Sequence, residues 1–315
     1  MKFVITGALG HIGSKLIRHI PTVYPGAQIT MIDDMSCQRY VSLFQLPAAG
    51  RYRFIEADVC SYDLSSQLAD ADVVVHLAAI TNAAASFEMK ERVEQVNYKA
   101  TTQVAAACAA AKVPLLYVST TSVYGTQKAI VDEACSKEEL QPQSPYAETK
   151  LREEEQLRRF AQESGLKFIT CRFGTIFGVS PGMRFHTAVN KFCWQAVMGL
   201  GVTVWRTALH QVRPYLDLQD AVRAIMFIVE KKLFDGEVYN VLTLNATVDE
   251  ILTAIKKRVP DLKIDYVDTK IMNQLSYHVA RQKMEDRGFS PSGQLDSAIG
   301  ETLELLGNSR SGSLL

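Results

Sequence analysis

The amino-acid sequence predicts an α/β protein with a doubly wound parallel sheet and a smaller C-terminal substrate-binding lobe. Short apolar segments alternate with helical segments from Lys2 to Phe173, as they do when parallel strands are joined by right-handed helical crossovers. After Phe173 the pattern becomes less regular, and residues 174–182 hold three glycines and a proline. We therefore expect a first domain over 1–173 and a mainly substrate-binding lobe over 174–307, with some segments returning to the sheet. Residues 308–315 are expected to form a disordered tail.

The expected elements follow from apolar runs and helix signals. In the first domain, the predicted strands are 2–6, 28–32, 53–56, 72–77, 115–119 and 167–173. Helices are expected from the glycine turn to residue 20, over 93–112 and from 145 to 163. In the second lobe we expect helices at 183–199, 221–231 and 248–258, and strands at 202–205 and 237–242.

Composition excludes several classes of function. Lys+Arg and Asp+Glu both number 34, so the formal net charge is zero, which argues against broad binding to nucleic acid or to an anionic membrane. The six cysteines are scattered without a Cys-x-x-Cys spacing, and the six histidines show no metal-ligand spacing. We therefore expect neither a metal site nor a disulfide framework. With no signal-peptide pattern and no long apolar run, the expected location is cytoplasmic.

Three glycines at the start of the chain predict a dinucleotide site. Gly7, Gly10 and Gly13 stand between the first strand and the first helix. Glycines there permit a tight turn, close approach of the backbone to a pyrophosphate, and close packing of helix on strand. The helix N-terminus adds free N–H groups for the phosphates. This context predicts a Rossmann domain.

Asp33 favours NAD over NADP. It ends the second strand, 20 residues after Gly13, where an acid accepts hydrogen bonds from the adenosine ribose and repels a 2′-phosphate. The alternative is that Asp33 and Asp34 simply mark a strand-ending turn. Asp58, after the third strand, is placed to reach the adenine, but an ordinary loop acid is the competing interpretation.

Tyr146 and Lys150 form a candidate reactive pair at a helix start. Ser144 can cap the helix, Pro145 suits its first position, and Gly165 ends it. The spacing of four puts both side chains on one face. An ammonium about 4 Å from the phenol is worth roughly 4 kcal/mol to the phenolate, which would bring the pKa of Tyr146 close to neutrality. Tyr146 would then transfer protons. The alternative is an exposed aromatic residue beside a solvated lysine.

Taken together, these residues resemble the extended short-chain dehydrogenase/reductase family, in its nucleotide-sugar epimerase/dehydratase branch, and are closest in motif to the UDP-sugar 4-epimerases. The resemblance runs from Lys2 to about Gly307. Its motifs are TGALGHIG at 6–13, DV at 58–59, HLAA at 76–79, Asn97, STTSVYG at 119–125, Tyr146 with Lys150, and RPYLDLQD at 213–220.

The resemblance implies a role for each matching position. Tyr146 would be the catalytic acid/base, Lys150 would bind the nicotinamide ribose and lower the pKa of the phenol, and Thr120 would hydrogen-bond the reacting sugar oxygen. The cofactor NAD would contact Gly7, Gly10, His11, Ile12, Gly13, Asp33, Asp58, Val59, Leu77, Ala78, Ala79, Asn97, Tyr146 and Lys150. The nucleotide-diphosphate sugar would contact Thr81, Thr120, Ser122, Tyr146, Thr175, Asn190 and Arg213, with Arg213 on the phosphates.

Departures from the family pattern bear on the reaction. The 4,6-dehydratases carry an Asp-Glu pair just after the catalytic threonine, where this chain has Thr121 and Ser122. Neither residue is a carboxylate base, so 4-epimerisation through a transient 4-keto sugar is the expected reaction. The alternatives are a 4-ketoreductase or an atypical dehydratase, and, less favoured, a non-catalytic NAD-binding sensor or scaffold. Thr175 in place of an asparagine, and Asp217 in place of a histidine, leave the sugar and nucleotide open.

The helix expected at 93–112 is rich in alanine. Small side chains let another helix approach closely. Packing within one chain and a helix-to-helix contact between two chains explain this composition equally well. The resemblance implies a homodimer in which this helix and the Tyr146 helix form a four-helix contact.

Overall fold

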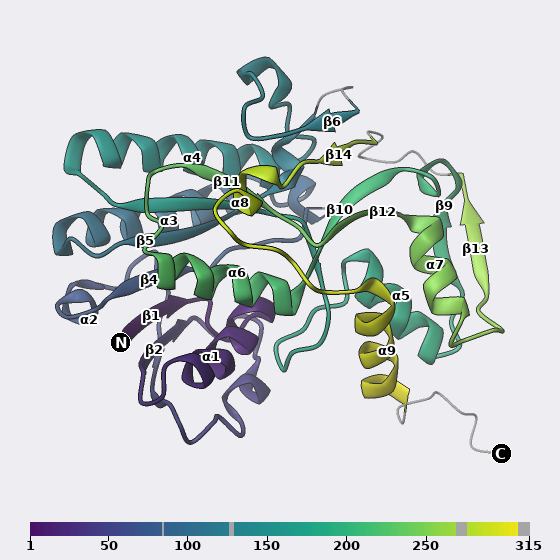
Figure 1. Ribbon diagram of the computed structural model, residues 1–315, viewed down its shortest axis with the longest axis horizontal. Coiled ribbons are helices and arrows are strands. Elements are labelled where there is room, and N and C mark those ends of the chain that lie inside the picture. Colours follow the sequence, from purple (N-terminus) through teal and green to yellow (C-terminus); the bar gives the residue numbers. More distant parts are fainter. Residues whose placement is uncertain (84, 126–128, 269–275, 308–315) are drawn as a thin grey trace.

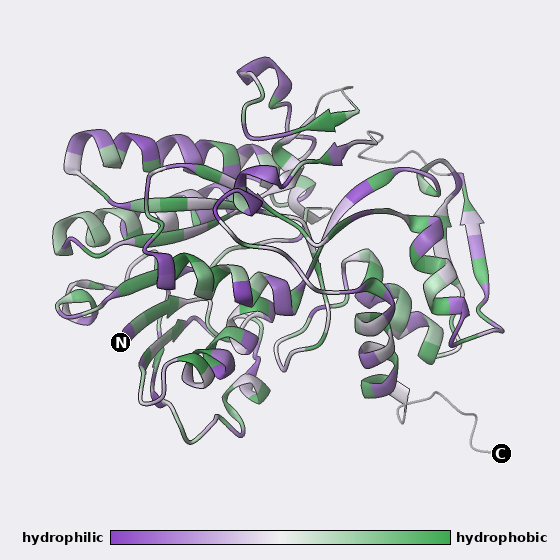
Figure 2. Cartoon of the chain, viewed as in Figure 1, coloured by the Kyte–Doolittle hydropathy of each residue, from purple (hydrophilic) through white to green (hydrophobic). Residues whose placement is uncertain are grey.

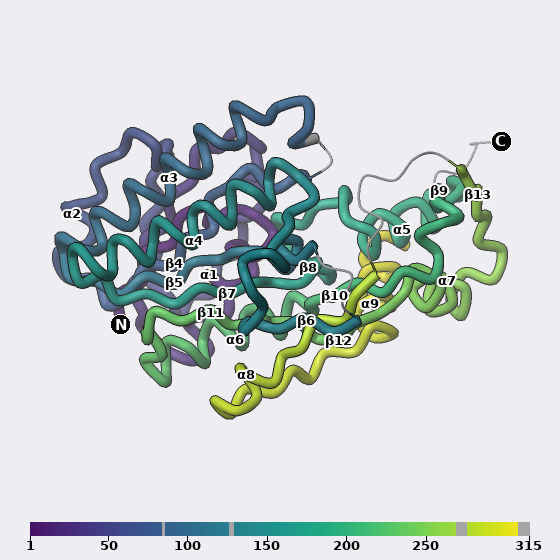
Figure 3. The backbone as a smooth tube through the Cα atoms, turned by 90° about the horizontal axis from the view of Figure 1, so that it is seen from above, coloured from purple at the N-terminus to yellow at the C-terminus, as the bar shows by residue number. Residues whose placement is uncertain are grey.

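The computed structural model describes residues 1–83, 85–125, 129–268 and 276–307. The expected tail at 308–315 lies outside the described residues. The chain forms a larger lobe around a seven-stranded sheet and a smaller lobe beside it (Figures 1 and 3).

The larger lobe is built on a parallel sheet with strand order β11-β7-β5-β4-β1-β2-β3. Every neighbouring pair runs parallel; β1, for example, pairs Thr6 with Ile32 on one side and with His76 on the other. The chain reverses its direction of travel across the sheet between β1 and β4, where doubly wound sheets form their ligand crevice. The strands are β1 (Lys2–Thr6), β2 (Gln28–Asp33), β3 (Arg51–Glu56), β4 (Val73–His76), β5 (Leu115–Thr120), β7 (Phe168–Phe173) and β11 (Val238–Val241).

Helices cover both faces of this sheet (Figure 1). One face carries α1 (His11–Val23) and α6 (Leu218–Lys231), and the other carries α2 (Ser65–Leu68), α3 (Lys90–Ala111) and α4 (Pro145–Ser164). Each face of the sheet has its own hydrophobic core, and successive strand residues pack into opposite cores. Ile5 packs on the side of α1 and α6, and Val4 packs on the side of α3 and α4. Strands buried on both faces are continuously apolar, which is why their sequence predicted them well. Figure 2 shows hydrophilic residues along much of α4, which faces outward from the core.

The smaller lobe has its own core and three short sheets. The first joins β8 (Thr175–Phe177), β10 (Val212–Asp217) and β12 (Leu244–Thr247), the second β9 (Val202–Trp205) and β13 (Ile264–Val267), and the third β6 (Ile130–Val131) and β14 (His278–Val279). The core of this lobe includes Phe177, Val204, Tyr215 and Ile251. Its helices are α5 (Ala188–Val197), α7 (Val248–Lys256) and α9 (Leu295–Leu306), while α8 (Gln282–Glu285) lies near β11. Five 3₁₀ turns complete the described elements, at Tyr40–Leu43, Ala85–Phe87, Thr121–Val123, Lys137–Glu139 and Arg206–Ala208.

Several expected bounds need correction. The helix expected at 183–199 is only α5 (Ala188–Val197); before it lies a loop whose Arg184 side chain donates to Thr81 and whose Arg184 carbonyl accepts from Asn190. The helix expected at 93–112 begins earlier, at Lys90. Two elements beyond residue 173 belong to the larger lobe: β11 forms an edge of the main sheet and α6 packs against α1. The sequence predicts that some later segments return to the sheet, but it places the helix at 221–231 and the strand at 237–242 in the second lobe, and this placement is corrected.

Candidate active site

The start of α4 fixes the position of Tyr146. The Ser144 hydroxyl accepts a hydrogen bond from the Ala147 N–H at 3.2 Å, and Pro145 occupies the first helical turn. The Tyr146 N–H, which has no partner within the helix, donates to Ser86 Oγ at 3.3 Å. The capped first turn therefore presents Tyr146 in a defined place, as the sequence predicted.

Lys150 lies one turn further along the same helix and is 3 % exposed. Its ammonium donates to the Tyr117 hydroxyl at 3.2 Å and to Glu153 Oε2 at 3.1 Å. It also stands 4.7 Å from the centre of the Tyr117 ring. The lysine is therefore a buried, paired cation, so the alternative of a solvated surface lysine is wrong.

Tyr146 does not have the lowered pKa that the sequence suggested. Burial raises its pKa above the ordinary value, while Lys150 and Arg184 lower it and Glu153 raises it further. The net direction is upward because desolvation of the phenolate outweighs the two cations. The expectation of a near-neutral phenol treated Lys150 as an unopposed charge and ignored Glu153, which neutralises it.

Thr120 ends β5, and its hydroxyl accepts a hydrogen bond from the Ser122 N–H at 3.1 Å. Thr121 is buried and donates to the Phe173 carbonyl at 3.3 Å. The strand end and the following 3₁₀ turn thus present hydroxyl groups where dehydratases of the resembled family carry an acid pair.

The glycine turn has the shape of a dinucleotide cradle. Gly7 has φ +66°, and a Cβ there would lie 2.5 Å from the Ala78 nitrogen. A Cβ on Gly13 would lie 2.5 Å from the Gly7 carbonyl oxygen. Both positions therefore exclude a side chain. Gly10 is the N-cap of α1 and gives it no side-chain cap, and the first turn of α1 has no acid. The amides of His11 and Ile12 are thus placed to bind phosphate oxygens, so the residues present fit NAD.

Polar residues at the strand ends beside this turn are held by backbone contacts. Asp33 accepts hydrogen bonds from the Leu9 N–H at 3.0 Å and the Met35 N–H at 3.2 Å. Its pKa is raised, chiefly by burial. Asp58 accepts from the Cys60 N–H at 2.8 Å, and Val59 is buried.

Asn97 orders the backbone after β4. Its side chain accepts from the Ile80 N–H at 2.8 Å and donates to the Ile80 carbonyl at 2.9 Å. The segment with Leu77, Ala78 and Ala79 runs directly into Ile80, and the Leu77 N–H donates to the Thr6 carbonyl at 3.0 Å. Asn97 therefore holds the backbone at Ile80 on both of its polar groups, and its contact with NAD stays a prediction.

A loop from the smaller lobe is anchored on the glycine turn. The Ser180 hydroxyl donates to the His11 carbonyl at 2.9 Å, and the Gly182 N–H donates to Ser14 Oγ at 3.0 Å. A Cβ on Gly182 would lie 2.2 Å from the Leu9 carbonyl oxygen. The His11 ring is bonded to the Gly178 carbonyl at 2.9 Å. His11 therefore joins the two lobes through its side chain.

This anchored loop places Arg184 near Tyr146, a feature that sequence reasoning missed. Arg184 Nη1 donates to Thr81 Oγ1. Its Nε is buried and has no partner among the described residues. A lone arginine in an irregular loop carries no spacing signal, so only the folded loop reveals it. Arg184 offers a cation beside the phenol, and Thr81 lies with it at the site.

Asn190, which is predicted to contact the substrate, has a structural role in this loop. It is fully buried, its Oδ1 accepts from the Gly178 N–H at 3.1 Å, and its amide donates to the Arg184 carbonyl at 3.1 Å. Both ends of the amide therefore hold the loop backbone, and a contact of Asn190 with the sugar stays a prediction. Asn190 supports the site by shaping the loop that carries Arg184.

The remaining predicted substrate residues lie on the small sheet of the second lobe. Thr175 of β8 pairs with Tyr215 of β10, which brings it close to the strand of Arg213. The Arg213 guanidinium lies 5.4 Å from the Tyr277 ring centre and donates to Gln211 at 3.2 Å. Asp217 caps α6 by accepting from the Gln219 N–H at 2.7 Å, so its carboxylate has a structural use.

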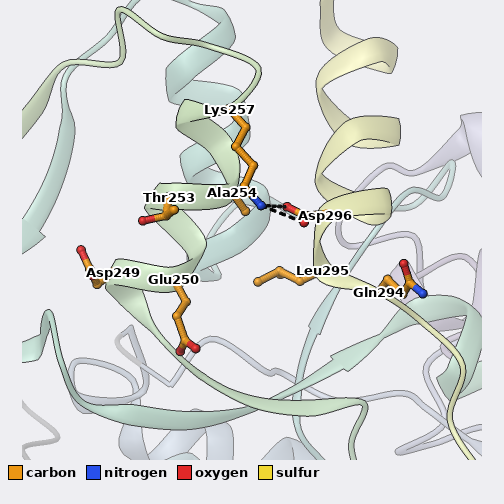
Figure 4. Close-up of a pocket in the computed structure, with 8 residues that line it drawn as sticks. All are labelled: Asp249, Glu250, Thr253, Ala254, Lys257, Gln294, Leu295 and Asp296. Carbon is orange, nitrogen blue, oxygen red and sulfur yellow. Dashed lines mark hydrogen bonds and ion pairs between the residues drawn. The ribbon is translucent and has the colours of Figure 1, made fainter.

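A separate hollow lies between α7 and α9, away from these residues (Figure 4). Lys257 and Asp296 form an ion pair of 3.0 Å across it. Its lining consists of Asp249, Glu250, Thr253, Ala254, Lys257, Gln294, Leu295 and Asp296. The hollow shares no residue with the Tyr146 cluster.

Among the described residues, no group of three or more His, Cys, Asp or Glu could hold a metal ion. Within the same ranges, no helix combines the length and the apolar character that a membrane crossing requires.

The fold and the site define a class: a two-lobed dinucleotide-binding protein with a glycine turn after its first strand and a capped Tyr-x-x-x-Lys helix. Residues 3–241 match the model of the NAD dependent epimerase/dehydratase family. The chain belongs to this family.

Known relatives cover nearly all of the chain. It is 27 % identical over 322 residues to a trifunctional UDP-glucose 4,6-dehydratase/UDP-4-keto-6-deoxy-D-glucose 3,5-epimerase/UDP-4-keto-L-rhamnose-reductase of Arabidopsis thaliana, covering 96 % of this chain and 46 % of that protein. The chain therefore spans about half the length of that relative.

Two solved structures share the fold. A UDP-N-acetylglucosamine 4-epimerase from Methanobrevibacter ruminantium, in complex with UDP-N-acetylmuramic acid, has 23 % identity and a TM-score of 0.86 over 98 % of both chains. A UDP-glucuronic acid 4-epimerase variant from Bacillus cereus, in complex with a fluorinated UDP-sugar and NAD, has 24 % identity and a TM-score of 0.86 over 98 % of this chain and 100 % of that one.

Proposed function

We propose that this protein is an NAD-dependent epimerase that inverts C4 of a nucleotide-diphosphate sugar. The observation that carries the proposal is the capped helix start that holds Tyr146 and Lys150, which packs against β5 and against the 3₁₀ turn that follows Thr120, with Thr121 and Ser122 at the positions of the dehydratase acid pair. The 4-epimerases among the structural neighbours support it. In this proposal residues 1–173 mainly bind NAD and residues 174–307 mainly bind the sugar nucleotide.

Thr120, Tyr146 and Lys150 each have a defined task. Tyr146 takes the proton from the C4 hydroxyl and returns one after inversion, while Thr120 hydrogen-bonds the same oxygen. Lys150 binds the nicotinamide ribose and stabilises the phenolate. The glycine turn and Lys150 would hold NAD, which would supply the acceptor and donor of the C4 hydride. Because Tyr146 has a raised pKa, its phenolate is a stronger base and its phenol a weaker acid, which favours removal of the C4 hydroxyl proton over its return.

The substrate contacts are assigned to both lobes, with Thr81 and Ser122 in the larger lobe and Thr175 and Arg213 in the smaller one. Arg213 binds the diphosphate, and Thr81, Ser122 and Thr175 contact the sugar. Arg184 adds a cation beside Tyr146. Arginine suits phosphate or carboxylate because its guanidinium offers two parallel donors.

A dehydratase or reductase is the second candidate, favoured by the Arabidopsis relative, whose name includes 4,6-dehydratase and reductase activities. Water elimination from C5 and C6 needs an acid and a base at the sugar. Thr121 is buried against the Phe173 carbonyl and Ser122 is a hydroxyl, so neither supplies the base.

The test is a product analysis. Purified protein is incubated with NAD and a panel of UDP-, dTDP- and GDP-sugars, and the products are followed by NMR. A 4-epimer without net consumption of NAD supports the proposal. A 4-keto-6-deoxy product would replace it with a dehydratase, and stoichiometric oxidation of NADH with a reductase. Tight NAD binding with no turnover of any sugar would favour a sensor or scaffold.

We also propose a cytoplasmic homodimer joined by α3 and α4. The two helices lie side by side on one face of the sheet (Figure 3). Ala106 and Ala110 of α3 are exposed or nearly so on the outer side, where a second copy could pack closely. Sedimentation at micromolar concentration tests this arrangement, and a monomer would contradict it.

A further inference from the structure

Glu153 contacts the reactive lysine but has no task in the mechanism above. It lies on α4, three residues after Lys150, so both side chains emerge on the same side of the helix. Its side chain is completely buried. A buried carboxylate this close to the proposed proton-transfer group needs an explanation.

One oxygen of Glu153 receives three hydrogen bonds from three elements. Lys150 of α4 donates at 3.1 Å, Thr101 of α3 donates at 2.9 Å, and the Tyr117 hydroxyl of β5 donates as well. The other oxygen, Oε1, is buried and has no partner among the described residues. The carboxylate is therefore held firmly on one side and left unsatisfied on the other.

Stability alone does not explain this residue. Burying an ion pair costs desolvation energy that the attraction between the charges barely offsets, and an unpaired polar atom adds to the cost. Packing the space behind Lys150 with an apolar side chain would avoid the unsatisfied oxygen. The charge on Glu153 thus points to a role toward Lys150.

We propose, on the basis of the proton transfer assigned to Tyr146, that Glu153 is a positioning residue: its carboxylate holds the Lys150 ammonium in place and offsets its charge, and thereby sets the readiness of Tyr146 to release its proton. Glu153 contacts neither substrate nor cofactor in this proposal. It acts through Lys150.

The surrounding charges agree with this role. Burial and then Lys150 lower the pKa of His76 to about 3, so this neighbour stays neutral. Burial and then Glu153 raise the pKa of Tyr117, which keeps its proton. Glu154, the next residue of α4, is paired with Arg172 of β7 at 2.7 Å.

Glu153 is thus the anion that opposes Lys150. Around Tyr146 itself, Lys150 and Arg184 lower the pKa while burial and Glu153 raise it. Removing the negative charge of Glu153 should leave Lys150 unopposed and let the phenolate form at lower pH.

The experiment is a direct titration of the Tyr146 phenol, which needs no turnover. The ultraviolet absorbance of phenolate is followed with pH in the NAD-bound full chain, and the curve of the matching Tyr146→Phe protein is subtracted to remove the other tyrosines. Glu153→Gln keeps the size and one acceptor but removes the charge. Its phenol should titrate about one pH unit below that of the unsubstituted protein.

Glu155→Gln is the matched control, because Glu155 is an exposed glutamate on the same helix. It removes the same charge in solvent and should leave the titration unchanged. An equal shift in Glu155→Gln would show a general charge effect and overturn the proposal. So would a Glu153→Gln phenol that titrates no earlier than the unsubstituted one, or that does not titrate while the fold is intact.

A second variant keeps the proposal testable if Glu153→Gln does not fold. Glu153→Asp keeps the charge but withdraws it by one methylene, so the phenol should titrate earlier by a smaller shift. An unchanged or later titration in Glu153→Asp would overturn the proposal. Because no sugar is present, a failure here is separate from failure of the epimerase assignment, which product analysis decides.

Discussion

Two buried ion pairs that start from neighbouring residues of α4 differ in nearly every respect. Glu154 is 1 % exposed and pairs with Arg172 through two parallel contacts of 3.0 and 2.7 Å. The Ser119 hydroxyl also donates to it at 2.6 Å. Glu153 meets Lys150 through a single contact of 3.1 Å and keeps one oxygen unsatisfied. We call Glu154–Arg172 the closed pair, because both carboxylate oxygens are hydrogen-bonded to the arginine. We call Lys150–Glu153 the open pair, because one carboxylate oxygen has no partner among the described residues.

The difference follows from the two cations. A guanidinium is planar and matches a carboxylate with two fixed hydrogen bonds, so Arg172 ties β7 to α4 and also donates to the Tyr124 hydroxyl at 3.0 Å. An ammonium is a compact charge with three rotatable donors. Lys150 can therefore serve Glu153 and Tyr117 and still have a donor for a ribose. The comparison leads us to expect that Arg172 stabilises the fold, and it is consistent with the role proposed for Lys150.

The largest expected effect is the loss of turnover when the phenol hydroxyl of Tyr146, near the open pair, is removed. Tyr146→Phe removes the proton-transfer group and keeps the ring, so turnover should fall by about 10²–10⁴-fold. NAD binding and thermal stability should change little. Steady-state kinetics on the identified sugar, with NAD affinity by calorimetry, make the measurement.

Tyr98→Phe is the control for that prediction. Tyr98 donates its hydroxyl to Gln156 at 2.9 Å on the outer side of α3 and α4, away from the open pair. It should retain near-normal turnover. If Tyr146→Phe also turns over normally at saturating substrate, Tyr146 is not the proton-transfer group.

Removing the charge of Glu154 in the closed pair should lower the free energy of unfolding. Glu154→Gln leaves the Arg172 guanidinium buried against a neutral amide, which should lower the free energy of unfolding by about 3–5 kcal/mol. Chemical denaturation measures the loss, and Glu155→Gln provides the solvent-exposed control. A loss below about 1 kcal/mol, the range of surface pairs, would remove the distinction between the two pairs.

The open pair and the glycine turn also differ in how far sequence could predict them. Gly7, Gly13, Asp33 and the capped start of α4 follow local rules of backbone and spacing, and the structure has the turn, the strand end and the cap at the positions that these rules predict. Glu153 was available from the sequence too, because it lies three residues after Lys150 on the same helix face. It was overlooked because an acid on a polar helix looks solvated until the helix is docked.

The second lobe was predicted less well for a physical reason. The positions of Arg184 and Asn190 depend on a loop that is hydrogen-bonded to His11 and Ser14, far away in the sequence, and Asn190 holds this loop from inside. No periodicity reports such contacts. The return of β11 to the main sheet likewise depends on pairing with β7, about 70 residues earlier.

Lowering the pH should reduce the free energy of unfolding through His76, a buried histidine near the open pair. Burial, with Lys150, lowers the pKa of His76 to about 3, against about 6.5 in the unfolded chain. Between these values only the unfolded state binds the proton, so the free energy of unfolding falls as the pH decreases below 6.5. From pH 6.5 to pH 5 this histidine should cost about 1.5 kcal/mol.

Denaturation curves at pH 5, 6.5 and 8 test this slope. His76→Gln cannot titrate and should make the slope shallower by up to one proton, whatever its effect on absolute stability. His210→Gln replaces an exposed histidine and should leave the slope unchanged. Equal slopes in the unsubstituted protein and His76→Gln would contradict a buried neutral imidazole beside Lys150.

The smallest effect is expected at Thr120, which shares the site with Tyr146 but gives only a hydrogen bond. A single hydrogen bond contributes about 0.5–1.5 kcal/mol, so Thr120→Ala should reduce kcat/KM by about tenfold or less. The same hydroxyl accepts the Ser122 N–H at 3.1 Å, so some of the loss could arise from a loosened turn. Thr120→Ser keeps the hydroxyl and should restore most of the activity, whereas Thr120→Val keeps the shape and should not. If Thr120→Ala lowers kcat/KM as much as Tyr146→Phe does, the proton passes through the threonine hydroxyl. The open pair would then orient the site and take no part in proton transfer.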